Sequence, residues 1–231
     1  MRHLVRPPVQ ATSTLSRDVP LVAGRCALLF VDTQNYNCRP DGGQYRDLSA
    51  KELERTYGYF FATLYHVAVP NWIKLQTAFR AAGIEVLYTV IQSLTADGRD
   101  RSLDYKISGF HIPPNSDDSR VIDALEPGPD EMVIPKTSSS VFISTNIDYV
   151  LRNLGVASLV VAGVLTDQCI DSTLRDACDL GYLVSVVTDA CATLTRERHE
   201  SSLRNNAGYA RQISTEALVA EVAALTAAQS I

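Results

Sequence analysis

Short, continuously apolar runs alternate with longer helical segments along most of this 231-residue chain. Runs of this kind are typical of strands buried on both faces of a parallel sheet, with helices covering both sides. The expected strands are residues 27–31, 84–91, 131–134, 158–162 and 183–187. The expected helices are residues 50–82, 119–125, 146–154, 166–180, 196–208 and 215–228. We therefore predict an α/β fold: a single-domain, doubly wound, Rossmann-like parallel sheet with helices on both faces.

The chain length fits one domain, which we place at residues 21–231. Residues 1–20 contain three prolines and several Ser and Thr residues, so we expect an extended N-terminal arm. Residues 93–115 form a polar stretch that ends in two prolines, and we expect a loop there.

Charge and cysteine content exclude several classes of protein. The net charge is −5 and no basic stripe occurs, so we expect no nucleic-acid partner. No apolar run approaches the ~20 residues of a membrane span, and the first 20 residues lack the apolar core of a secretion signal. Five cysteines without CxxC spacing argue against a disulfide framework. A cytoplasmic protein without membrane attachment is expected.

Polar residues follow four of the predicted strands: Asp32, Gln92, Lys136 and, a few residues further on, Cys169. In an open parallel sheet, ligands bind outside the carboxyl ends of the strands, near the point where strand order reverses. We therefore expect these four residues to converge at one end of the sheet.

Cys169 is the strongest candidate for a nucleophile because it begins a predicted helix. Free backbone N–H groups and the helix dipole at that position are expected to lower the pKa of the thiol and to stabilise an oxyanion. Asp32 can serve as the base, since the four histidines lie away from strand ends and surface roles are expected for them. Lys136 can stabilise both anions. Taken singly, Asp32 also fits a turn residue and Lys136 a solvated surface lysine.

Three segments resemble the isochorismatase-like cysteine hydrolase superfamily. They are residues 27–35 (ALLFVDTQN), residues 133–136 (VIPK) with Phe142, and residues 163–182 (GVLTDQCIDSTLRDACDLGY). The resemblance implies a catalytic triad of Asp32, Lys136 and Cys169. It also implies a non-proline cis peptide at Val164–Leu165, an oxyanion hole formed by the N–H groups of Leu165 and Cys169, and a homodimer or homotetramer.

Within this superfamily, the sequence resembles the ureidoacrylate and biuret-type amidohydrolases, and this resemblance implies hydrolysis of a small amide or ureide through a thioester. The candidate substrate-binding residues are Gln34, Asn35, Gln92, Tyr36 and Phe142, and a substrate carboxylate could meet Arg99, Arg101 or Lys106. Core packing is an equal alternative for Tyr36 and Phe142. Residues 92–100 contain no histidine, so we expect no metal, and no cofactor is expected.

Three alternatives remain open at this stage. Isochorismatase-type cleavage of a vinyl ether does not need a cysteine nucleophile, so the presence of Cys169 favours amide chemistry. A non-catalytic binding protein on the same fold would not need all three polar groups. A thiol redox protein would need a resolving cysteine, and none is adjacent to Cys169 in the sequence.

Overall fold

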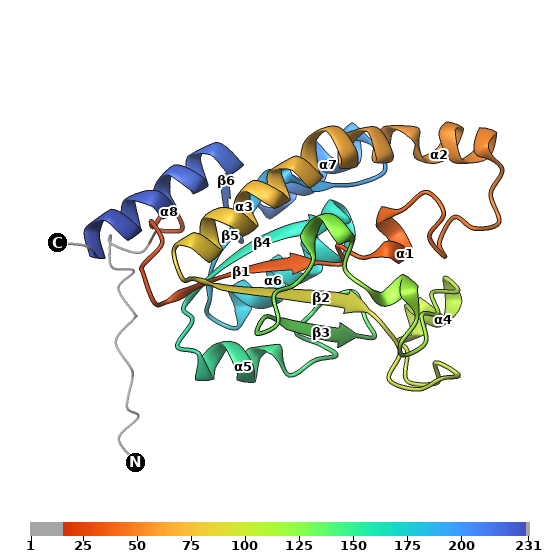
Figure 1. The fold of residues 1–231 in the computed structure, drawn as a ribbon, viewed down its shortest axis with the longest axis horizontal. Helices are drawn as coiled ribbons and strands as arrows, with labels where there is room; N and C mark the ends of the chain where they lie inside the picture. The colour runs from red at the N-terminus through yellow and green to blue at the C-terminus, as the bar shows by residue number, and fades with distance from the viewer. Residues whose placement is uncertain (1–15, 230–231) are drawn as a thin grey trace, which may run out of the picture.

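A single sheet of six parallel strands forms the centre of the computed structural model, which describes residues 16–229 (Figure 1). The strands are β1 (Cys26–Val31), β2 (Glu85–Ile91), β3 (Met132–Lys136), β4 (Ser158–Val164), β5 (Leu183–Ala192) and β6 (Arg211–Ile213). Their spatial order is β3-β2-β1-β4-β5-β6. The predicted doubly wound parallel sheet is confirmed.

Strand order reverses between β1 and β4, and this is where such sheets bind ligands. The last residue of β1, Val31, pairs with Thr89 on β2 and with Gly163 on β4, so the three central strands end at nearly the same level. The arrowheads of β1, β2 and β3 point toward the end of the molecule that carries α1 (Asn35–Cys38) and α4 (Leu103–Ile107) (Figure 1).

Alternate residues of β1 face two separate hydrophobic cores. Leu28 and Phe30 belong to the core that includes α3 (Val69–Ala81) and α8 (Thr215–Gln229). Leu29 belongs to the core that includes α5 (Ile147–Asn153) and α6 (Asp171–Asp179). Figure 1 shows α3 and α8 on one side of the sheet and α5 on the other. Because β1 is buried on both faces, its sequence is apolar without alternation.

The predicted helix over residues 50–82 is interrupted. α2 (Ala50–Thr63) begins with a capping box between Ser49 and Glu52, and a π-helical turn, η1 (Leu64–Ala68), separates it from α3. Pro70 lies at the start of α3 and has no N–H to donate to the carbonyl of residue 66. The missing hydrogen bond gives a physical reason for the wider turn.

The predicted helix over residues 119–125 is wrong. Two short 3₁₀ turns, η2 (Asp117–Ser119) and η3 (Asp123–Leu125), occupy this region. Between them, Val121 forms an antiparallel bridge with Gln34, and the N–H of Ile122 donates to the carbonyl of Thr33 at 3.0 Å. Pairing with the segment after β1 therefore overrides the local helical pattern.

Several elements were not predicted from the sequence: α1, α4 inside the expected loop, and β6. The others lie close to their expected ranges, including α7 (Arg196–Asn206), although β5 continues to Ala192. Most of the predicted N-terminal arm lies outside the described residues. Within residues 16–229, no helix has the length and apolarity needed to cross a membrane.

Gly163 is the position in the sheet where we expect a side chain to be least tolerated. Its φ is +130°, and a Cβ would lie 2.1 Å from the carbonyl oxygen of Val31. We expect Gly163→Ala to lower the free energy of unfolding by about 3 kcal/mol or more, because β1 and β4 would have to separate. Urea unfolding followed by circular dichroism measures the change.

Gly155→Ala is the matched control. Gly155 also has positive φ, +72°, but a Cβ there would have open space around it. Only the backbone penalty of about 1–2 kcal/mol is then expected. Equal losses in the two variants would contradict the importance of close contact between β1 and β4.

Candidate active site

Asp32, Lys136 and Cys169 meet at the carboxyl end of the sheet, as the sequence predicts. The ammonium nitrogen of Lys136 lies 3.0 Å from Asp32 Oδ2 and 3.4 Å from Cys169 Sγ. Asp32 follows β1, Lys136 ends β3, and Cys169 lies in η4 (Thr166–Ile170), the π-helical turn after β4. The Asp32 and Lys136 side chains are essentially without solvent exposure, and Cys169 is 7% exposed.

The Lys136 ammonium is fully engaged by its surroundings. Besides the ion pair with Asp32, it donates to the carbonyl of Ser138 and to the hydroxyl of Tyr105, both at 2.9 Å. These three oxygens match the three protons that an ammonium can donate. Lys136 is therefore fixed in place as a buried cation.

The backbone of Asp32 has φ of 56°, a conformation that residues other than glycine adopt only when their surroundings enforce it. Its N–H donates to the carbonyl of Thr89 at 2.9 Å, which continues the pairing of β1 with β2. The chain leaves the sheet at this point, and the carboxylate lies beside Lys136. Backbone conformation thus contributes to the placement of the carboxylate.

Burial sets the protonation states of the site. Burial raises the pKa of Cys169 to about 12. The neighbouring Asp32 carboxylate also raises this pKa, and the Lys136 ammonium lowers it. Burial also raises the pKa of Asp32, although Lys136 and Cys169 counteract it. For Lys136, burial disfavours the charge, but Asp32 and Cys169 outweigh it and hold its pKa well above the ordinary value.

The expectation that the helix start lowers the pKa of Cys169 is therefore wrong. Desolvation of the thiolate, followed by the charge of Asp32, raises the pKa of the thiol. The resting site holds a protonated thiol beside a buried carboxylate and an ammonium. A carboxylate with a raised pKa is the better proton acceptor, which suits the role of a base.

Tyr105 is a fourth polar group at this site that the sequence reasoning missed. It lies on α4, is 1% exposed, and its hydroxyl lies 3.8 Å from Cys169 Sγ. Burial first, followed by the nearby Cys169 and Asp32, keeps the pKa of its phenol well above the ordinary value despite Lys136. The only local sequence signal is Ser102, whose side chain caps α4 by accepting from the N–H of Tyr105.

A small cavity of about 30 Å³, which we call the Cys169 cavity, opens beside the thiol of Cys169. It is lined by Asp32, Tyr36, Asn37, Gln44, Ile91, Asp104, Tyr105, Phe110, Ser139, Leu165, Gln168 and Cys169. Of the five predicted substrate-binding residues, only Tyr36 is among them. The amides of Asn37, Gln44 and Gln168 were not predicted.

The other four predicted substrate-binding residues lie elsewhere. Gln34 is buried and uses its amide on the backbone of Ile91 and Asp118. The Asn35 amide donates to the carbonyl of Asp117, and Phe142 packs against the ring of Tyr182. The amides of Gln34 and Asn35 serve folding, because buried amides must satisfy their hydrogen bonds within the protein. Phe142 contributes a packing contact.

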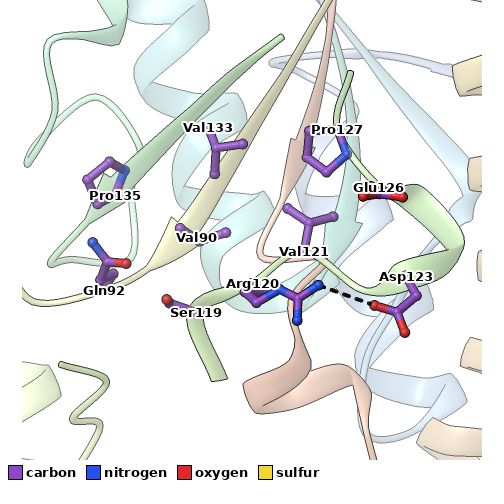
Figure 2. Close-up of a pocket in the computed structure, with 10 residues that line it drawn as sticks. All are labelled: Val90, Gln92, Ser119, Arg120, Val121, Asp123, Glu126, Pro127, Val133 and Pro135. Carbon is purple, nitrogen blue, oxygen red and sulfur yellow. Dashed lines mark ion pairs between the residues drawn. The ribbon is translucent and has the colours of Figure 1, made fainter. Parts of the chain in front are cut away.

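Gln92 lines a different cavity, of about 330 Å³, beside β2 and β3 (Figure 2). One ion pair, Arg120 with Asp123 at 3.8 Å, lies at its edge (Figure 2). This cavity is larger than the Cys169 cavity, but among the described residues that line it there is no cysteine and no buried charged side chain. The smaller cavity is therefore the candidate active site.

The three cations expected to meet a substrate carboxylate also lie outside the Cys169 cavity. Arg99 is exposed and forms an ion pair with Asp97 at 3.0 Å. Arg101 donates to the carbonyls of Gly98 and Phe110, and Lys106 is exposed on α4.

The turn that carries Cys169 is held from two sides. The peptide between Val164 and Leu165 is cis, as the family resemblance predicts. Beyond it, the Thr166 hydroxyl lies 2.9 Å from His199 Nδ1, and the Thr166 carbonyl accepts from the hydroxyl of Ser202. His199 is half-buried, so the surface role expected for it is wrong. Among residues 16–229, no cluster of three or more His, Cys, Asp or Glu could hold a metal.

The isochorismatase domain model matches residues 26–217 of this chain. Two curated relatives are the ureidoacrylate amidohydrolases RutB of Agrobacterium fabrum and Acinetobacter baylyi, both 30% identical. The first match covers 74% of this chain and 78% of the relative, and the second covers 81% and 79%.

Solved structures show the same fold. A cysteine hydrolase from Pseudomonas syringae pv. phaseolicola superposes with a TM-score of 0.78 at 24% identity and covers 93% of this chain and 100% of its own. N-carbamoylsarcosine amidase from Thermoplasma acidophilum superposes with a TM-score of 0.63 at 26% identity. That match covers 83% of this chain and 97% of the amidase.

Loss of Lys136 tests the buried ion pair. Lys136→Met leaves the Asp32 carboxylate buried without its cation, so we expect the free energy of unfolding to fall by about 3–5 kcal/mol at neutral pH. The double variant with Asp32→Asn should regain most of this loss. Urea unfolding of wild type and variants measures both values.

The pH dependence of the unfolding free energy of Lys136→Met shows whether the unpaired Asp32 carboxylate causes the loss of stability. The pKa of Asp32 is already raised in the folded protein, and removal of Lys136 raises it further. The loss of unfolding free energy in Lys136→Met is thus present at neutral pH, and it becomes smaller as falling pH protonates Asp32. A pH-independent loss would show that the cost is one of packing.

Proposed function

Because this chain belongs to the isochorismatase family, we propose that it is an amidohydrolase that cleaves a carbon–nitrogen bond in a small linear amide or ureide, with Cys169 as the nucleophile. One observation carries the proposal: the carboxylate of Asp32 and the thiol of Cys169 both line a cavity, and they lie 3.0 Å and 3.4 Å from the buried ammonium of Lys136. The names of the relatives, ureidoacrylate amidohydrolase and N-carbamoylsarcosine amidase, support the reaction class.

The reaction begins with proton transfer from the Cys169 thiol to Asp32 as the sulfur attacks the substrate carbonyl carbon. The carbonyl oxygen becomes an oxyanion, which we assign to the backbone N–H groups of Leu165 and Cys169. Asp32 then returns the proton to the leaving nitrogen as the carbon–nitrogen bond breaks. Ammonia or an amine departs, and the acyl group stays on sulfur as a thioester.

In hydrolysis of the thioester, water is the nucleophile and the sulfur of Cys169 is the leaving group. Water takes the place of the departed amine, Asp32 accepts its proton, and the new hydroxyl attacks the thioester carbonyl. The carbon–sulfur bond breaks and the sulfur regains the proton from Asp32. The cycle needs only the substrate and one water, and no cofactor is proposed.

Lys136 makes proton transfer between these groups possible. In the resting state the site holds one anion and one cation, and after transfer the negative charge has moved from oxygen to sulfur. Lys136 contacts both atoms, at 3.0 Å and 3.4 Å, so it stabilises the charge before and after the step. A buried cation that keeps its proton throughout fits this role.

Replacement of the nucleophile is the direct test. We expect Cys169→Ala to lower kcat by at least about 10³-fold, because the thioester cannot form. Ammonia release from a panel of ureides and simple amides measures activity, and the melting temperature checks folding. Cys178→Ala is the matched control, since Cys178 lies on α6 outside the Cys169 cavity. Retained turnover in Cys169→Ala would overturn the proposal.

The acid side of the pH–rate profile reports on Asp32. Only the carboxylate form accepts the thiol proton, so kcat/KM falls as pH drops through the pKa of Asp32. Burial raises this pKa, which places the midpoint above the ~3.9 of an ordinary aspartate. Initial rates over a pH series in constant ionic strength locate it. A midpoint at or below the ordinary value would argue against Asp32 as the base.

The resemblance also carries two proposals that concern the whole protein. We propose a homodimer or homotetramer in the cytoplasm, as is common for this superfamily. Light scattering coupled to size-exclusion chromatography determines the mass, and an apparent mass of one chain would exclude both assemblies.

A further inference from the structure

We propose that the substrate carries no negative charge: the site selects neutral or cationic amides and ureides and disfavours carboxylates. This inference rests on the proposed amidohydrolase function and names the substrate class of that site. It differs from what the relatives' names indicate, because ureidoacrylate and N-carbamoylsarcosine both carry a carboxylate.

The first argument is the absence of a cation for such a carboxylate. Among the described residues that line the Cys169 cavity, none is arginine, lysine or histidine. Enzymes that bind carboxylates commonly provide an arginine, whose two donors match the two oxygens. The cavity wall offers instead the amides of Asn37, Gln44 and Gln168 and the rings of Tyr36 and Phe110.

Lys136 cannot fill this role. Its nitrogen already contacts oxygens of Asp32, Tyr105 and Ser138, and its side chain is not exposed. A substrate carboxylate would have to displace one of these oxygens and would compete with Asp32 for the same charge. The ion pair with Asp32 also leaves the inner site with no net positive charge.

Arg101 is the next candidate, and its surroundings exclude it as well. Its guanidinium donates to the carbonyls of Gly98 and Phe110, which hold it behind the cavity wall. At Tyr36, burial and then the Asp118 carboxylate raise the pKa of the phenol to about 12, and Arg101 counteracts them only in part. Arg101 does not line the Cys169 cavity.

The second argument is the charge at the entrance. Asp104 lines the Cys169 cavity and is exposed, and it forms no ion pair with any residue in the range 16–229. It also lines a neighbouring outer cavity of about 450 Å³, together with Asp171, Asp176 and Arg175. Arg175 is bound to Asp171 at 2.7 Å, so Asp104 and Asp176 in this outer cavity form no ion pair within the described part of the chain.

Aspartates at the entrance and a neutral inner site act together on a substrate. A carboxylate would lose its hydration without gaining a cation, and it would approach past like charges. A neutral carbamoyl group meets amide donors and acceptors, and a cationic tail would be attracted to Asp104. Asp104 is thus a specificity-determining residue that acts through its charge.

Alkylation of Cys169 tests the charge preference without a known substrate. Iodoacetamide and iodoacetate are nearly the same size and differ in charge. We expect the ratio of their rates at Cys169, measured by peptide mass spectrometry, to exceed the ratio for glutathione under the same conditions by about tenfold. Asp104→Asn should reduce this preference by about threefold, mainly by speeding the reaction of iodoacetate, and Asp104→Lys should reduce it further.

Asp123→Asn is the matched control. It removes the same charge from an exposed aspartate of the other cavity (Figure 2), and it should leave the ratio unchanged. An equal effect of Asp104→Asn and Asp123→Asn would indicate a general effect of net charge and would overturn the role of Asp104. A ratio at Cys169 equal to that of glutathione would overturn the charge preference itself.

A matched substrate series separates this inference from the proposed function. The compounds are 3-ureidopropionate, 3-ureidopropionamide and 3-aminopropylurea, which are similar in length and differ in terminal charge. We expect kcat/KM for the neutral and cationic compounds to exceed that for the anion by at least about tenfold, with Asp104→Asn narrowing the gap. Turnover that depends on Cys169 but favours the anion would refute the substrate class and leave the amidohydrolase proposal intact. If no member of the series or of the wider amide panel shows turnover dependent on Cys169, both proposals fail.

Discussion

The buried ion pair between Asp32 and Lys136 is the interaction on which the rest of the site depends. Two charged side chains without solvent exposure cost several kcal/mol in lost hydration, and only close contact and further hydrogen bonds offset this cost. The protein provides them through Tyr105 and the carbonyl of Ser138. A hydrophobic pair of similar volume would be as stable, so the charges point to function more than to stability.

The parallel sheet makes this arrangement possible because its strands end at one level. Asp32 and Cys169 follow the two strands between which the order reverses, and Lys136 reaches the same point from β3, beyond β2. The long lysine side chain spans the distance that backbone pairing cannot close. The same burial that surrounds the ion pair raises the pKa of Cys169 to about 12, so the nucleophile that we propose is a thiol at rest and needs Asp32 as its base.

Much of this could be predicted from the sequence, because strand-end positions follow from periodicity and from the rule for parallel sheets. Asp32, Lys136 and Cys169 were found in that way, together with the family resemblance. Apart from Tyr36 and Leu165, the wall around Asp32 and Cys169 was not predicted; Tyr105 and Asp104, for example, lie on a five-residue helix inside a polar stretch without hydrophobic periodicity. Gln34 was misassigned for a related reason, since only the fold shows that the backbone of Ile91 and Asp118 uses its amide.

The residues at the strand ends and the residues on α4 differ in how strongly the fold constrains them. Residues that end strands are fixed by backbone pairing, and changes to them disturb the sheet as well as the chemistry. Exposed residues of α4 such as Asp104 lie outside the core, so their side chains can change with little effect on it, whereas Tyr105 on the same helix is buried against Lys136. A substitution at such an exposed position can therefore change the charge beside the Cys169 cavity without disturbing Asp32, Lys136 or Cys169. The charge of residue 104, which the fold leaves free to vary, is where we place the selection of substrate.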